Sequence, residues 1–502
     1  MVDLKKKFEK KILAYALKNA IEHEGKCQPG SILSSLFHEG LEKSQVKDIM
    51  PLIQETVKKV NSMSLEEQEK EFSKEEKVIS HRETRDENEL PELQNVPKSG
   101  VIMRFAPSPS GQLHIGHIIS NMPSSLYVKK YGGKFYIRIE DTNPESIEEG
   151  SYNAIKRDCD WLFGNVSEYI IQSERLEKYY KYAEKLIEKN SAYVCTCNPE
   201  EFKELLKASK PCPCRSLDKK EQINRWKKML DKNGYKEHEA VLLFKSDLEH
   251  ENPALRDFPL ARINESKHPK QGNKFKVWPL MNLSVTVDDI EYNMTHIIRG
   301  KDHKDNAERQ KMIYNVLGFE KKFPITLFMG RIKFTDIEMS KRKIAEAIKK
   351  KEFEGWNDIR LPTVNVLRLR GYQPEAFELM TIQRGISEVD KVLSRKDYFD
   401  ILDNFNRKVL KNKAIQAVFV LDDKKYSKRK TQKPQSSTNK HMDVDLSAHT
   451  DVTVLMPDNS KVSGSSDINL KSLKDTSIVY FSGLGYCRYN EKEKIKFWFC
   501  HA

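Results

Sequence analysis

The sequence predicts an α/β protein whose parallel-sheet core is split by an inserted domain, preceded by a helical module and followed by a β-barrel. Strand-like and helix-like segments alternate over residues 99–190 and 275–345, as in a parallel α/β fold. Residues 191–274 interrupt this alternation with four cysteines and a Lys-rich helical pattern. In residues 404–502 the apolar period becomes two, which indicates strands closing into a barrel.

Composition excludes several classes of protein. The chain has 502 residues, 38% of them hydrophobic, which is enough for several domain cores. Its net charge of +13 favours a polyanionic partner. No apolar run approaches the roughly 20 residues of a membrane span, and Met1–Lys11 does not begin a signal peptide. Eight cysteines are too few for a disulfide scaffold, which favours a reducing compartment. Together these observations predict a cytoplasmic protein without a membrane segment.

The first region, residues 1–98, is predicted to be a helical module followed by a charged linker. Apolar residues recur at helical spacing from Leu4 to about Leu65. The highly charged stretch 66–98 then indicates helix fading into linker before the first strand of the core.

The core and the regions after it follow from local signals. The strand-like segment Phe135–Glu140 precedes a helical pattern over Glu148–Trp161, and the run Val277–Val287 continues the alternation. Residues 346–403 are predicted to be helical, with Arg360-Leu-Pro-Thr opening one helix and Gly371-Tyr-Gln-Pro separating the next. Period-two segments begin after Phe405.

Residues 104–117, RFAPSPSGQLHIGH, carry the densest chemistry in the chain. A short apolar run predicts a buried strand, a Pro/Ser/Gly turn follows, and His114 and His117 stand at the expected start of a helix. The N–H groups of a helix start attract anions, Gly116 permits close approach of a ligand, and the two histidines share one helix face. The segment therefore predicts a phosphate site, although an isolated H-x-x-H pair is more often surface or capping chemistry.

Three further segments place this motif in a family context. These are RIEDTNP at 138–144, IRGKDH at 298–303 and EMSK at 338–341. Together with residues 104–117 they resemble the class I glutamyl/glutaminyl-tRNA synthetases, most closely the archaeal-type glutamyl enzymes, over nearly the whole chain. The resemblance implies a Rossmann-like catalytic core, an acceptor-binding insertion, a helical stem-contact domain and an anticodon-side β-barrel.

The activity implied by this resemblance is ATP-dependent activation of L-glutamate, followed by transfer to the 3′ end of tRNA(Glu). Mg²⁺ would accompany ATP, the enzyme would be a monomer, and charging of tRNA(Gln) is left open. Two alternatives remain, a glutaminyl-tRNA synthetase and a catalytically silent tRNA-binding scaffold. Such a reaction needs mainly positioning and preorganised positive potential.

The resemblance assigns the phosphates of ATP to two segments. His114 and His117 would contact them in the transition state, and Lys341 would hold the departing pyrophosphate. Gly116, Met339 and Ser340 complete the implied ATP-binding set. The family's loop usually opens with a lysine, whereas this chain has Glu338, to which no role is assigned. Without the resemblance, Lys341 would be interpreted as a solvated lysine in a basic helix start.

The resemblance also implies a pocket for glutamate. Arg104 and Arg299 would bind its carboxylates, with Ser108 and Glu140 near its ammonium group. Glutaminyl enzymes carry a small uncharged residue at the position of Arg299, so this arginine favours glutamate, because guanidinium pairs with carboxylate through charge-assisted hydrogen bonds. From the residues alone, Glu140 is rather an ion-pair partner of Arg138.

One pocket position departs from the family. Relatives usually offer a tyrosine where Met281 stands, and a thioether cannot replace a phenolic hydrogen bond. Either another group, such as Trp278, completes the pocket, or binding is weaker.

Four cysteines form two C-x-C pairs, Cys195-Thr-Cys197 and Cys212-Pro-Cys214. Four thiolates could close a tetrahedral zinc site, and several relatives carry zinc in the acceptor-binding insertion. C-x-C is a looser signal than C-x-x-C, so free, partly buried thiols remain the alternative.

The C-terminal region is shorter than the family implies. Archaeal-type relatives have two barrels, the distal one inserted in the proximal one, and here only the outer strands are recognisable. Residues 424–440 form a basic, Ser/Gln/Asn-rich tract that we predict to be a disordered loop. Much of the distal barrel is therefore expected to be missing.

Overall fold

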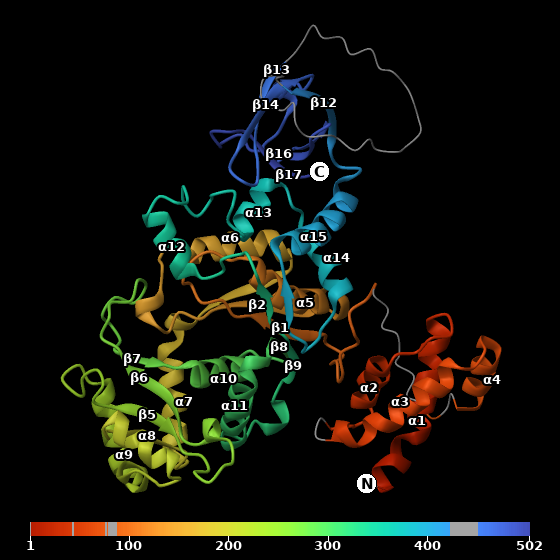
Figure 1. Ribbon diagram of the computed structural model, residues 1–502. Helices are drawn as coiled ribbons and strands as arrows, with labels where there is room; N and C mark the ends of the chain where they lie inside the picture. Colours follow the sequence, from red (N-terminus) through yellow and green to blue (C-terminus); the bar gives the residue numbers. More distant parts are fainter. Residues whose placement is uncertain (1, 43–44, 76–77, 79–87, 422–449) are drawn as a thin grey trace. The chain divides into compact units, whose positions relative to one another are not determined.

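The computed structural model describes residues 2–42, 45–75, 78, 88–421 and 450–502. The chain divides into two compact units, Met1–Arg85 and Asp86–Ala502 (Figure 1). The first unit is helical, as its apolar spacing predicts. Its helices are α1 (Val2–Glu22), α2 (Pro29–His38), α3 (Val46–Asn61) and α4 (Leu65–Glu75).

The helices of the first unit enclose an apolar core with one polar residue in it. Phe8, Ile12 and Ile53 are fully buried there. Gln68 of α4 is also fully buried, and its Nε2 donates to the carbonyls of Gly25 at 3.0 Å and of Val60 at 2.9 Å. This side chain therefore joins the end of α3 to the turn after α1.

The core of the second unit is built on parallel strands. Strands β1 (Val101–Phe105), β2 (Gly133–Ile139) and β3 (Val166–Ile171) pair in that order, with α5 (Ile115–Tyr131) and α6 (Ser151–Phe163) as crossover helices. A second parallel pair, β8 (His296–Gly300) and β9 (Ile325–Met329), adjoins β1, because the N–H of Thr295 donates to the carbonyl of Ile102 at 3.0 Å. The predicted α/β class is confirmed.

The apolar run Val277–Val287 is not a single element. It contains the short strand β7 (Val277–Pro279) and residues 281–287 of the helix α10 (Met281–Glu291). Every residue from Asn282 to Ile290 is buried, so tertiary packing on all sides overrides the low helix propensity of its β-branched residues. This helix carries Asp288 and Asp289 into the protein interior.

The inserted region forms an antiparallel sheet against helices. Its strand order is β4-β5-β6-β7, and α7 (Leu176–Glu188) and α9 (Lys219–Leu230) pack on this sheet's core. The remaining strands are β4 (Ala192–Cys195), β5 (Val241–Phe244) and β6 (Phe258–Ile263), and α8 (Pro199–Lys207) follows β4. The chain then returns to the core through α10, which leads into β8. The helix α11 (Lys304–Leu317) lies between β8 and β9.

The helical stretch after the core contains α12 (Lys341–Lys349), α13 (Val364–Arg370), α14 (Pro374–Arg384) and α15 (Arg395–Leu410). As predicted, residues 360–363 open a helix, since Thr363 caps α13 through the N–H of Val366 at 3.2 Å. Gly371 ends this helix with φ of 106°. One strand interrupts the predicted helices: β11 (Lys391–Leu393) pairs in parallel with β10 (Ile332–Phe334).

The C-terminal strands close into a barrel in the order β12-β14-β13-β17-β16-β15. They are β12 (Ile415–Leu421), β13 (Thr450–Leu455), β14 (Lys461–Ser466), β15 (Ile478–Ser482), β16 (Gly485–Tyr489) and β17 (Phe497–His501). The period-two segments predicted after Phe405 are confirmed as strands, the first of them at Ile415, while α15 continues to Leu410 and packs Leu402 and Leu410 into the core. The tract 424–440 lies outside the described residues.

Candidate active site

His114 and His117 cap the start of α5 through their own rings. The N–H of Gly116 donates to Nδ1 of His114 at 3.2 Å, and the N–H of His114 donates to Nδ1 of His117 at 3.1 Å. The two rings lie 3.9 Å apart between centroids. Because Nδ1 accepts in both, each neutral ring carries its proton on Nε2 and can donate one further hydrogen bond there.

Both histidines are held uncharged. Burial lowers the pKa of His114 to about 4, and the positive charge of Lys341 adds to this effect. Burial also holds the pKa of His117 well below its usual range, with further contributions from His114 and Lys341. At neutral pH the pair therefore offers two polar donors rather than two positive charges.

Gly116 keeps this corner open. A Cβ atom at Gly116 would lie 3.0 Å from Cε1 of His114 and 3.2 Å from Cε of Met339, both tighter than ordinary contact. The structure thus brings Met339 against Gly116 and His114, from which it is far away in the sequence.

Lys341 reaches back to the turn that precedes His114. It is the first residue of α12, and its Nζ donates to Oγ of Ser110 at 3.3 Å and to the carbonyl of Gly111 at 3.5 Å. Burial lowers the pKa of Lys341 to about 8, partly opposed by the attraction of Glu148. Ser340 caps α12 by accepting from the N–H of Lys343 at 3.5 Å.

Glu338, the departure from the family's loop, has a structural position. Its Oε1 accepts from the N–H of Ser340 at 2.7 Å, and its Oε2 pairs with Nζ of Lys343 at 3.0 Å. These hydrogen bonds hold the pKa of Glu338 below its usual value. A carboxylate at this position closes the turn before α12, and the positive N-terminal end of the helix stabilises its negative charge.

A cavity of about 140 Å³ lies at the carboxyl ends of the parallel strands. Arg104 near the end of β1, Glu140 directly after β2 and Arg299 of β8 line it, together with Met281 of α10. Ligand sites of open α/β sheets lie at this edge. The remaining lining residues are Ala106, Val285, His303 and Gln310. Ser108 is exposed in the turn and does not line this cavity, so its role stays a prediction.

Carboxylates hold Arg138 and Arg104 beside this cavity. Nη1 of Arg138 lies 2.5 Å from Oδ1 of Asp289, and its Nη2 lies 3.0 Å from Oε1 of Glu140. The ion pair considered as the alternative for Glu140 is therefore present, and the same carboxylate also faces the cavity. Nε of Arg104 is 3.9 Å from Oδ1 of Asp289.

The cavity holds more positive than negative groups. Burial lowers the pKa of Arg104 to about 9, with repulsion from Arg138 as the next cause, and burial also lowers the pKa of Arg299. Nη1 of Arg299 donates to Oε1 of Gln310 at 3.0 Å. However, Nε of Arg104, Nε of Arg299 and Nε2 of Gln310 are buried and have no hydrogen-bond partner within the described part of the chain. Buried unpaired donors around one cavity indicate an anionic ligand.

The four cysteines of the inserted region meet in space. Sγ of Cys195 lies 3.7 Å from Sγ of Cys212, and Sγ of Cys197 lies 3.7 Å from Sγ of Cys214. All four sulfurs lie within 4.8 Å of one another. A tetrahedral zinc with Zn–S bonds of about 2.3 Å separates its sulfurs by about 3.8 Å, so the thiols fit this ion. Among the described residues they form the one cluster of this kind.

Comparison with known proteins decides the family. The model "tRNA synthetases class I (E and Q), catalytic domain" matches residues 100–412. The chain belongs to this family. A "Glutamate--tRNA ligase" of Methanocaldococcus jannaschii is 42% identical over 419 residues, which are 83% of this chain and 73% of that protein. Another of Pyrococcus furiosus is 40% identical over 426 residues, with 82% and 73% covered. The resemblance to the glutamyl/glutaminyl group is thus confirmed.

A solved glutamate tRNA ligase from Elizabethkingia meningosepticum is 20% identical, covering 62% of this chain and 70% of that chain with a TM-score of 0.43. Within the described part of this synthetase, no helix has both the length and the apolar content needed to cross a membrane.

The strand-end cavity corrects one expectation from the sequence. Trp278 does not complete the cavity, because it is fully buried in the core of the inserted region, where its Nε1 donates to the carbonyl of Asn264 at 3.1 Å. Met281 stands at the cavity with 40% of its surface exposed. Sequence reasoning missed Gln310 and gave His303 no role, because nothing in the pattern of α11 or of the segment before it distinguishes them.

Proposed function

We propose that this synthetase activates L-glutamate with ATP and transfers the glutamyl group to the 3′ end of tRNA(Glu). The observation that carries the proposal is the strand-end cavity, where buried Nε–H donors of Arg104 and Arg299 have no hydrogen-bond partner among the described residues. The two relatives described above, both named "Glutamate--tRNA ligase", support the same amino acid.

Charge explains why glutamate suits this pocket better than glutamine. A carboxylate accepts paired, charge-assisted hydrogen bonds from a guanidinium, whereas a neutral amide accepts through one oxygen and leaves donors and charge unmatched. Glu140 remains available for the ammonium group of the amino acid, although it shares its charge with Arg138. Ser108 is proposed as a second contact for this ammonium group from the adjoining turn.

Activation involves both this pocket and the histidine corner, which is formed by His114, His117 and Lys341. A carboxylate oxygen of glutamate attacks the α-phosphorus of ATP, and the bond from that phosphorus to the bridging oxygen of pyrophosphate breaks. Negative charge then grows on the phosphate oxygens. The Nε2–H groups of His114 and His117 and the Nζ of Lys341 are the donors placed to meet it, while Gly116 and Met339 shape the space for the nucleotide. Ser340, the residue directly before Lys341, completes the proposed ATP-binding set together with Met339. Mg²⁺ accompanies the phosphates of ATP, and we assign it no protein ligand.

We also propose a structural zinc ion held by Cys195, Cys197, Cys212 and Cys214. The sulfur separations support it, and all four positions of a tetrahedron would be filled by protein, so no position is open for catalysis. Further donors stabilise thiolate at Cys214: the N–H of Thr196 at 3.5 Å and Nη1 of Arg225 at 3.3 Å. When bound, zinc would cross-link the two turns.

For partners and location we propose a cytoplasmic monomer that binds tRNA(Glu). The net charge of +13 supports a polyanionic partner. None of the eight cysteines, all of which the structure describes, forms a disulfide, which supports a reducing compartment.

The experiment that tests this function measures charging of tRNA(Glu) and of tRNA(Gln) with labelled glutamate or glutamine. Pyrophosphate exchange with each amino acid, with and without tRNA, accompanies it. We expect charging of tRNA(Glu) with glutamate alone. Charging with glutamine would identify a glutaminyl enzyme, and no exchange under any condition would identify a silent scaffold. Charging of tRNA(Gln) with glutamate decides whether the enzyme accepts a second tRNA.

A further inference from the structure

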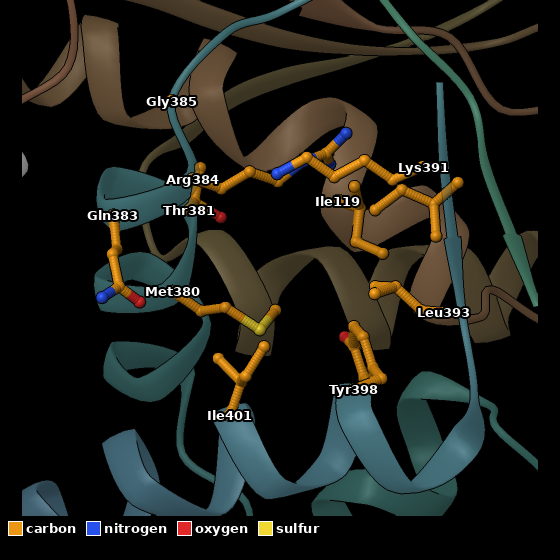
Figure 2. Close-up of a pocket in the computed structure, with 11 residues that line it drawn as sticks. Ile119, Met380, Thr381, Gln383, Arg384, Gly385, Lys391, Leu393, Tyr398 and Ile401 are labelled. Carbon is orange, nitrogen blue, oxygen red and sulfur yellow. The ribbon is translucent and has the colours of Figure 1, made fainter. Parts of the chain in front are cut away.

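A second cavity lies away from the proposed active site, among α5, α14, α15 and the strand pair β10–β11. Its volume is about 260 Å³, just below the roughly 300 Å³ of the smallest drug-sized pockets. Figure 2 shows its walls, which are mostly apolar: Ile119 of α5, Met380 of α14, Leu393 of β11 and Ile401 of α15. It would accommodate the apolar body of a small molecule.

Two polar groups of this cavity have no hydrogen-bond partner among the residues that the structure describes. Tyr398 of α15 is only 2% exposed, and its hydroxyl is buried and unpaired. Nη1 of Arg384, the last residue of α14, is likewise buried without a partner. Figure 2 shows the Arg384 side chain extending across one end of the cavity, with Tyr398 entering from α15. Buried donors left unpaired cost free energy that a bound acceptor would recover.

The charge of the cavity specifies that acceptor. Its described lining contains two cations, Arg384 and Lys391, and no acidic side chain. Burial raises the pKa of Tyr398, so its hydroxyl stays protonated and can donate. Burial lowers the pKa of Arg384, and a bound anion would reverse this effect. A carboxylate can accept from both a guanidinium and a phenol, and its single negative charge matches one buried guanidinium in a mostly apolar cavity better than the double charge of a phosphate.

We propose that this cavity binds a small apolar monocarboxylate, with its carboxylate on Arg384 and Tyr398 and its hydrocarbon body against Met380 and Ile401. No residue of the proposed glutamate pocket lines it. The ligand would nevertheless touch two elements that lead to the active site. Ile119 belongs to α5, which begins beside His114, and Ile332 belongs to β10, which precedes the Lys341 turn.

The test uses octanoate as the probe, with octanamide as its uncharged match. Binding to the full-length protein is measured by isothermal titration calorimetry, and binding at this site is followed by the variants Arg384→Met and Tyr398→Phe. We expect octanoate to bind at least about tenfold more tightly than octanamide, since the charged group gains a charge-assisted contact. Arg384→Met should remove this preference.

Matched variants keep the outcome decisive. Lys408→Met removes a charge from the exposed side of α15, outside the cavity lining, and should leave octanoate affinity unchanged. Tyr398→Phe removes one oxygen and retains the ring, so it should weaken octanoate binding by a few-fold even if Arg384→Met does not fold. Equal affinity for octanoate and octanamide, no binding of octanoate, or undiminished binding in both cavity variants would overturn the proposal.

Discussion

The proposed glutamate pocket and the histidine corner are both buried and both suited to anions, yet they differ in how much of their positive charge is present at neutral pH. Beside the pocket, Arg138 pairs with Asp289 at 2.5 Å and with Glu140 at 3.0 Å, and Nε of Arg104 lies 3.9 Å from the same Asp289. In the corner, burial lowers the pKa of His114 to about 4 and that of Lys341 to about 8. Burial also lowers the pKa of Arg104, to about 9, but this arginine stays protonated at neutral pH, whereas His114 is neutral there.

This difference suits the two regions to different steps, namely selection of the amino acid and its activation. A permanent guanidinium discriminates glutamate from glutamine as the amino acid binds, before any bond changes. Neutral imidazoles and a partly suppressed lysine attract less in the resting state and contribute most when charge grows on the phosphates. The comparison therefore predicts that substitutions in the pocket change amino-acid selection, whereas substitutions in the corner change the rate of activation.

The largest expected effect is that of Lys341→Ala. The rate of pyrophosphate exchange at saturating glutamate should fall by about a hundredfold or more, with the KM for glutamate nearly unchanged, as for a group acting on the transition state. Lys343→Ala is the matched control, because Lys343 is exposed and pairs with Glu338. It should retain activity within about threefold. A raised KM for glutamate as the only defect of Lys341→Ala would remove the distinction between the two regions.

A pH profile should show the suppressed charge directly. Lys341 loses its proton as pH rises through about 8, so kcat/KM for ATP should fall above that pH. The fall should approach about tenfold per pH unit if the protonated lysine is required. Lys341→Arg keeps a cation at high pH, and any activity that it retains should lack this alkaline fall. An identical fall in Lys341→Arg would assign it to another group.

The smallest effect on activation is expected from the cysteine cluster, which belongs to neither region. Protein purified without a polyhistidine tag should contain about one zinc per chain. Cys212→Ser should lose the metal and bind tRNA more weakly, while Cys27→Ser, in the helical N-terminal unit, should keep it. Glutamate and ATP should still bind Cys212→Ser. Metal-free wild-type protein with full charging activity would favour free thiols.

Local signals in the sequence predicted one region better than the other. The Pro/Gly turn and the H-x-x-H spacing were enough to place His114 and His117 at the start of α5, because helix capping depends on neighbouring residues. The pocket depends on Asp289, which lies in the last turn of the buried helix α10, 151 residues from its partner Arg138. No local pattern connects such residues.

The same reasoning explains the other differences in the fold. The run Val277–Val287 changes from strand to helix within itself, because complete burial removes the polar face that would have revealed the helical period. The strand β11 was not predicted within the helical stretch, since its three residues gain order only by pairing with β10. Helix α15 outlasts the predicted boundary at Phe405 because its last turn packs into the core.

The central claim is that permanent charge in the pocket selects glutamate. Arg299→Cys tests it most directly, with Arg157→Cys, an exposed arginine of α6, as control. With tRNA present, kcat/KM for glutamate and for glutamine is measured by pyrophosphate exchange. Loss of one charge-assisted contact, about 1.5–3 kcal/mol, should lower the value for glutamate about ten- to a hundredfold. The values for glutamine and the KM for ATP should stay nearly constant, so selectivity collapses. An unchanged ratio of glutamate to glutamine in Arg299→Cys would contradict the claim.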